Sequence, residues 1–132
     1  MTTTLADIKD TFDLLDDWAD RYAFLIELGD ELPPFPDELR SKEHKVKGCM
    51  SQVWVVGSEE DGRMHYLADS DAHIVRGLVA LVRLLFEGKS KAEVVAMDVN
   101  PVLAELGLDK HLSPGRSNGL HSMIKKIKRL AS

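Results

Sequence analysis

The side chain with the greatest chemical reactivity belongs to Cys49, the single cysteine in the chain of 132 residues. It lies in the run Lys45–Ser51 (KVKGCMS), directly before a segment rich in β-branched and aromatic residues. A cysteine thiolate is a nucleophile and a metal ligand, whereas a buried thiol behaves as a small apolar side chain. Cys49 is therefore either a reactive group or a packing residue, and its neighbours bear on that choice.

Two features of the flanking residues favour a reactive thiolate at position 49. Gly48 permits a turn or the close approach of another molecule, because glycine has no β-carbon. Side chains alternate along an extended segment, so Lys45, Lys47 and Cys49 would point the same way. Nearby ammonium groups stabilise a thiolate and lower the thiol pKa from its usual value of about 8.5. The pattern gives the hypothesis that the pKa of Cys49 is lowered, which thiol titration measures.

Helices are expected on both sides of this segment. Apolar residues from Leu5 to Ile26 recur at helical spacing, with a break expected near Asp16-Asp17 and an end at Gly29. Prolines between positions 33 and 36 predict a loop. Capping and stop signals predict the later helices: Asp71 with Gly88, Ser90 with Glu93, Asn100-Pro101 with Gly107, and Ser113-Pro114.

The middle of the chain reads as a β-hairpin. Strands are expected over Ser51–Val56 and Arg63–Ala68, with a turn at Asp61-Gly62. Because two strands alone are marginal in water, a third strand over His44–Lys47 or helices packed on one face must complete the unit. The fold class is therefore α+β, with a small antiparallel sheet of about three strands packed against helices in one domain of residues 1–132.

Composition and charge exclude several classes of protein. The charged fraction of 30% and the net charge of -5 are typical of a soluble globular chain and argue against nucleic acid as the main partner. No apolar run is long enough to cross a membrane, and the N-terminus lacks a secretory signal. One cysteine cannot form an internal disulfide, so we expect a cytoplasmic location.

The remaining ionisable residues give weaker signals. The five histidines show no zinc-binding spacing, so no metal site is expected. A basic run closes the chain in the last expected helix, where cations complement the helix dipole and a solvated face is expected. It consists of Lys125, Lys126, Lys128 and Arg129.

Three ordered blocks of sequence resemble the SufE family, the sulfur-acceptor partners of cysteine desulfurases in iron–sulfur cluster assembly. They are Gly48–Trp54, Asp69–Leu78 and His111–Leu120, and the run Ile26–Gly29 before the prolines also fits. The resemblance extends from about Leu5 to Leu130. Met50, where the family frequently has Gln, and Gly115, where it frequently has Ser, are mild departures.

The resemblance implies a function and a fold. A pyridoxal-phosphate-dependent, SufS-like desulfurase would pass a persulfide sulfur to Cys49, which would carry it to a downstream iron–sulfur scaffold and so stimulate the desulfurase. Such a carrier is not itself an enzyme and needs no cofactor of its own. The implied fold is similar to that of the IscU-like scaffold proteins, with the cysteine on a loop that is protected at rest.

The resemblance also points to residues that support Cys49. Gly48 and Lys47 flank it, and Asp71 and Arg116 correspond to family residues in the second and third blocks. Asp71 would cap a helix and steady the loop around Cys49. Arg116 would contact a carboxylate or the sulfur-transfer partner, and the alternative is that it forms a structural ion pair.

Of three other functions, the residues argue against one and leave two open. A cluster scaffold fails, because iron–sulfur clusters are usually held by several thiolates and this chain has one cysteine. A thiol peroxidase or redox sensor would use Cys49 with a resolving thiol from another molecule. An interaction module would keep full activity with its partner after Cys49→Ala.

Overall fold

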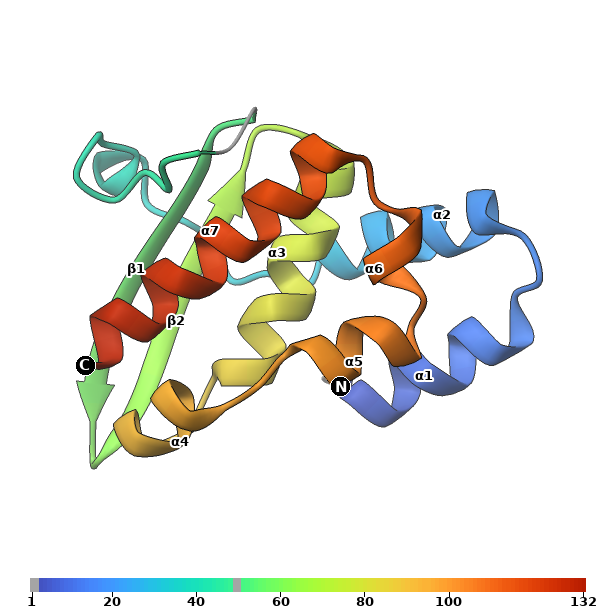
Figure 1. Ribbon diagram of the computed structural model, residues 1–132. Helices are drawn as coiled ribbons and strands as arrows, with labels where there is room; N and C mark the ends of the chain where they lie inside the picture. Colours follow the sequence, from blue (N-terminus) through green and yellow to red (C-terminus); the bar gives the residue numbers. More distant parts are fainter. Residues whose placement is uncertain (1–2, 49–50) are drawn as a thin grey trace.

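Helices precede and follow a single β-hairpin in the computed structural model, which describes residues 3–48 and 51–132. Figure 1 shows this order, which confirms the predicted α+β class. The elements are α1 (Leu5–Leu14), α2 (Trp18–Gly29), a short 3-10 helix (Asp37–Leu39), β1 (Val53–Glu60), β2 (Arg63–Ser70), α3 (His73–Phe86), α4 (Lys91–Ala96), α5 (Asn100–Glu105), α6 (Leu108–His111) and α7 (Pro114–Ala131).

The hairpin turns at the predicted Asp61-Gly62 pair. Both residues have positive φ, 53° for Asp61 and 77° for Gly62, as a two-residue type I′ turn requires. Antiparallel pairing then runs from Glu60 opposite Arg63 to Val53 opposite Ser70. The strands are longer than the sequence pattern indicated, because the pairing continues beyond the apolar residues into their polar neighbours.

The expectation of about three strands is wrong for the described residues, which form a two-stranded sheet. The candidate third segment contacts β1 through one isolated bridge, between Lys45 and Trp54. Its backbone hydrogen bonds to β1 are Val46 N–H to the Val53 carbonyl (2.7 Å) and Val55 N–H to the His44 carbonyl (2.9 Å). The other solution to the marginal stability of a hairpin, helices packed against it, is the one observed.

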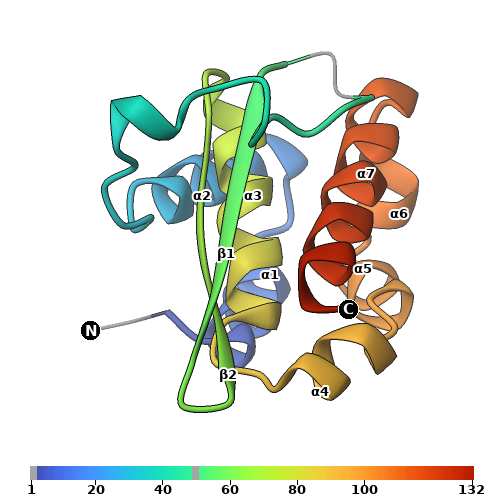
Figure 2. The same ribbon diagram turned by 90° about the vertical axis from the view of Figure 1, so that its left-hand side faces the viewer.

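Helix α3 is the central element of the core. It lies between the hairpin and α2 in Figure 1, and seen from the side in Figure 2 it runs behind the strands while α7 lies beside them. A β-carbon added at Gly77 would lie 2.2 Å from the Leu25 carbonyl oxygen, so this glycine permits the close crossing of α2 and α3. Val55, Leu81 and Phe86 are fully buried.

Most of the predicted helix ends are confirmed. Asp17 caps α2 by accepting from the Ala19 N–H (2.9 Å), at the break expected near Asp16-Asp17. Ser90 and Glu93 form a capping box, and Ser113 accepts from the Arg116 N–H at the start of α7. The predicted cap at Asn100 is wrong, because Asn100 is the first helical residue of α5 and Val99 occupies the cap position.

Candidate functional site

Cys49, the predicted nucleophile, lies outside the described residues together with Met50. The site is therefore built from the described residues that flank it in sequence, Gly48 and Ser51, and from the elements that contact those flanks.

The segment before position 49 lies against helix α7. Gly48 has a φ of +87°, and a β-carbon there would meet the Ser122 hydroxyl oxygen at 2.9 Å. The positive φ fits the turn that the sequence suggested, while the close neighbour is Ser122 of the same chain. The close approach of another molecule stays a prediction. Lys45 and Lys47 are exposed while Val46 between them is buried, which confirms the predicted alternation as far as Lys47.

Asp71 holds the segment after position 50. Its Oδ1 accepts from the Gln52 N–H (3.1 Å), and its own N–H donates to the Gln52 carbonyl (3.2 Å). The predicted helix-capping role is wrong, because Ala72 is the cap residue of α3 and no side chain caps it. The carboxylate instead accepts from Gln52, which directly precedes β1 and lies 19 residues earlier in sequence.

A second carboxylate, that of Asp69, joins three parts of the chain. Its Oδ2 pairs with Arg40 (2.8 Å) and its Oδ1 with Arg76 (2.8 Å), which also donates to the Gly29 carbonyl at the end of α2 (3.3 Å). Burial raises the pKa of Asp69, but hydrogen bonds from Arg40, from the Ser70 amide and from Arg76 outweigh it, so its pKa lies below the usual value. The Arg40 guanidinium also lies 5.1 Å from the ring centre of Trp54.

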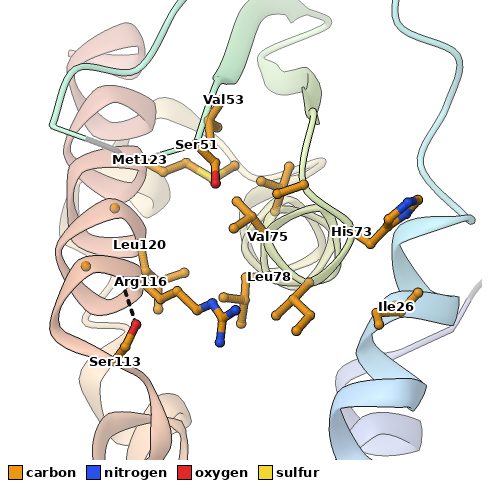
Figure 3. A pocket seen from close by; sticks show the side chains of 15 residues that line it. Ile26, Ser51, Val53, His73, Val75, Leu78, Ser113, Arg116, Leu120 and Met123 are labelled. Atoms are coloured by element: carbon orange, nitrogen blue, oxygen red, sulfur yellow. Dashed lines mark hydrogen bonds between the residues drawn. The ribbon is translucent and has the colours of Figure 1, made fainter.

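An apolar cavity of about 700 Å³ opens beside Ser51, between α3 and α7. Gly115 and Gly119 are four residues apart on α7, so the helix face that lines the cavity carries no side chain at these two positions. Leu78, Leu120 and Met123 supply apolar walls. Figure 3 shows the cavity with its lining side chains from α2, β1, α3 and α7.

Arg116 is the one permanently charged residue among the described residues that line this cavity. Its backbone N–H donates to the Ser113 hydroxyl (3.3 Å), and its side chain points from α7 toward Leu78 (Figure 3). No ion pair among the described residues includes it, so the structural ion pair that was the alternative role is not formed there. An exposed guanidinium at the edge of an apolar cavity attracts an anionic group.

Sequence reasoning missed two features next to the site. The Asp69 network joins Arg40 and Arg76 across the chain, and no local pattern signals such a pairing. Lys126 was expected on a solvated face, but it is 8% exposed and hydrogen-bonded to backbone carbonyls. Its position beside the apolar stripe of α7 is the signal that could have indicated this.

The sequence matches the SufE family, described as a Fe-S metabolism associated domain, over residues 6–131. An uncharacterised SufE-like protein of Rhizobium meliloti (strain 1021) is 48% identical over 130 residues, 96% of this chain and 93% of the relative. A SufE-like protein of Rhizobium etli, also uncharacterised, is 49% identical over 129 residues, 95% of this chain and 87% of the relative.

The fold also matches a solved structure. The solution structure of a hypothetical protein from Thermus thermophilus superimposes with a TM-score of 0.76 at 22% identity, covering 96% of this chain and 92% of the other. Within the described residues, no helix has the length and apolar character needed to cross a membrane. On the family match and the two close relatives, the chain belongs to the SufE family, the sulfur-transfer proteins of iron–sulfur metabolism.

Proposed function

We propose that this protein takes a persulfide sulfur from a cysteine desulfurase onto Cys49 and delivers it to a scaffold for iron–sulfur cluster assembly. The observation that carries the proposal is the family match over residues 6–131, which contain a single cysteine. The surroundings of position 49 support it, because both described flanks contact neighbouring elements beside a cavity that is lined in part by Arg116.

The transfer step is an exchange between a thiolate and a persulfide. The Cys49 thiolate attacks the outer sulfur of the persulfide on the desulfurase, and a new sulfur–sulfur bond forms while the old one breaks. The desulfurase cysteine leaves as a thiolate, and Cys49 becomes the persulfide. The exchange needs no oxidant or reductant, and carbon–sulfur cleavage takes place on the desulfurase, where pyridoxal phosphate supplies that chemistry.

The charges around position 49 favour anionic sulfur. Lys45 and Lys47 are exposed in the segment that leads to Cys49, and Arg116 lies at the cavity on the other side of Ser51. None of the described residues that line the cavity is a carboxylate. The two lysines stabilise a thiolate or a persulfide anion, although solvent screens the effect of exposed groups.

Two contacts fix the flanks of the proposed acceptor. Gly48 lies against Ser122 of α7, and the Gln52 N–H donates a hydrogen bond to Asp71, which precedes α3 in sequence. A nucleophile attached to fixed flanks loses less freedom when the reacting sulfur atoms align, which lowers the entropic part of the barrier. Removal of sulfur from the desulfurase by this route should also raise its turnover.

Mass spectrometry after incubation with a cysteine desulfurase and free cysteine tests the proposal. We expect the intact protein to gain one sulfur atom at Cys49, reversibly with reductant, and desulfurase turnover to rise. The matched control is Cys49→Ser, which should gain no sulfur and give no stimulation. A wild-type protein that gains no sulfur and leaves turnover unchanged would refute the carrier function.

A further inference from the structure

Lys126 is a buried cation that the proposed transfer step does not use. Its side chain lies on α7, and Nζ donates to the carbonyl oxygens of Glu43 (3.1 Å) and Lys45 (3.3 Å). Burial lowers the pKa of this ammonium, as do Arg129 and Lys47, while Glu43 acts in the opposite direction. Removing an ammonium from water is costly unless it is hydrogen-bonded, so these two bonds account for its position.

The two carbonyl groups belong to the segment that leads to position 49. Glu43 lies in a turn over residues 42–44, and Lys45 follows it at the bridge to β1. The His44 carbonyl and the Val46 N–H bond to β1, whereas the Glu43 and Lys45 carbonyls point to α7. Lys126 therefore supplies donors to carbonyl groups that do not pair with β1.

The contact with α7 continues to the end of this segment. Ser122 precedes Lys126 by one helical turn, so both lie on the same side of α7. It is the residue that a β-carbon at Gly48 would meet. Residues 43–48 are thus held between β1 and α7, with Lys126 near one end and Ser122 at the other.

We propose that Lys126 is a positioning residue for sulfur transfer, holding the backbone of residues 43–48 in place through the Glu43 and Lys45 carbonyls. This role rests on the proposed function of Cys49, which follows directly after the segment. Lys126 is not assigned a part in the chemical step. It acts by limiting the positions that the preceding backbone can take.

The test compares Lys126→Met with Lys128→Met. Methionine keeps much of the side-chain packing and removes the donors. Lys128 is the matched control, because it also donates from α7 to a backbone carbonyl, that of Met97, away from residues 43–48. Amide hydrogen exchange at Val46 reports on the segment without any desulfurase, and single-turnover sulfur transfer reports on function.

We expect Lys126→Met to speed exchange at Val46 by about tenfold and to slow transfer at saturating desulfurase by a similar factor, with the KM for desulfurase unchanged. Lys128→Met should change neither rate, and Lys126→Arg, which keeps donors, should restore most of both. If Lys126→Met does not fold, Lys126→Leu, which also lacks a donor, provides the same comparison.

Two results would overturn the positioning role. One is wild-type exchange at Val46 in the Lys126→Met protein, and the other is an equal loss of transfer in the Lys126 and Lys128 variants. Failure of the carrier function is distinguishable from both, because the wild-type protein would then gain no sulfur while the exchange difference at Val46 persisted.

Discussion

At the scale of single residues, Asp71 shows how one hydrogen bond decides a role. An aspartate before a helix is a common cap, because its carboxylate accepts from the free N–H groups of the first turn. Here the Asp71 carboxylate accepts from Gln52 instead, and the Ser70 hydroxyl accepts from the Ala72 N–H (3.3 Å). The carboxylate therefore holds the start of β1 rather than α3.

These two roles predict different outcomes for Asp71→Ala. We expect amide exchange at Gln52 to accelerate about fivefold, the size of one lost hydrogen bond, while the first-turn amides of α3 at Ile74 and Val75 stay unchanged. Asp71→Asn, which keeps an acceptor oxygen, should give an intermediate rate at Gln52. Faster exchange at Ile74 and Val75 with an unchanged Gln52 would mean that Asp71 acts as a cap.

Elements are joined by the paired charges around Asp69. This carboxylate links the loop containing Arg40, the end of β2 and helix α3, and through Arg76 it also reaches the end of α2. Because its pKa is lowered on folding, Asp69 contributes stability that is present above the unfolded pKa of about 3.9. That contribution is lost as the pH falls through the lower folded value.

The corresponding prediction concerns Asp69→Asn. At pH 7 we expect the free energy of unfolding to fall by about 2 kcal/mol, because both arginines lose a charged acceptor. The difference from wild type should begin to shrink at about pH 4, where the unfolded carboxyl takes up a proton, and should be lost once the pH falls below the lower folded pKa.

Urea unfolding at several pH values measures the effect of Asp69→Asn. Asp37→Asn is the matched control, because Asp37 also pairs with Arg40 but its side chain is 96% exposed. That variant should change the free energy of unfolding very little. A difference between Asp69→Asn and wild type that stayed constant with pH would show that charge is not the cause.

The sequence predicted the elements whose ends are set by local chemistry. The capping box of Ser90 and Glu93 and the turn at Asp61-Gly62 depend on residues close together in the chain. The third strand did not form because turns at residues 42–44 and 47–48 bound the segment, which leaves one bridge to β1. The bonds of the Lys126 ammonium were missed for a different reason, because they reach carbonyls of residues 81 and 83 positions away. Periodicity places Lys126 at the edge of an apolar stripe, but it does not identify the backbone that the side chain reaches.

The same limit applies to the candidate site. The turn at Gly48 was predictable from its own lack of a β-carbon, and its positive φ agrees with that reading. The cavity was not predictable, because it arises where Gly115 and Gly119 of α7 face Leu78 of α3, and the distance between two helices is a property of the packed core. The family resemblance marked Arg116, while the structure places it beside that cavity.

At the scale of the whole molecule, segments that are distant in sequence lie together in one region of the fold. Segment 43–48, the start of β1, α3 and α7 all contribute to the surroundings of the cavity or of the flanks of position 49. On the proposed function a sulfur donor reaches Cys49 from outside, so this region is where we expect a desulfurase to dock. Arg116 lies at the cavity with no ion-pair partner among the described residues, and a carboxylate on the desulfurase would pair with it.

Arg116→Ala should therefore weaken docking rather than chemistry. We expect the KM for desulfurase, measured by varying this protein in a turnover assay, to rise about fivefold at low salt while the maximal stimulation is kept. High salt should reduce the difference, because exposed charges are screened. Lys125→Ala is the matched control, since nine residues along α7 turn it about 180° away from Arg116. Equal effects of the two substitutions would point to net charge alone, whereas a fall in maximal stimulation with an unchanged KM would place Arg116 in the transfer step itself.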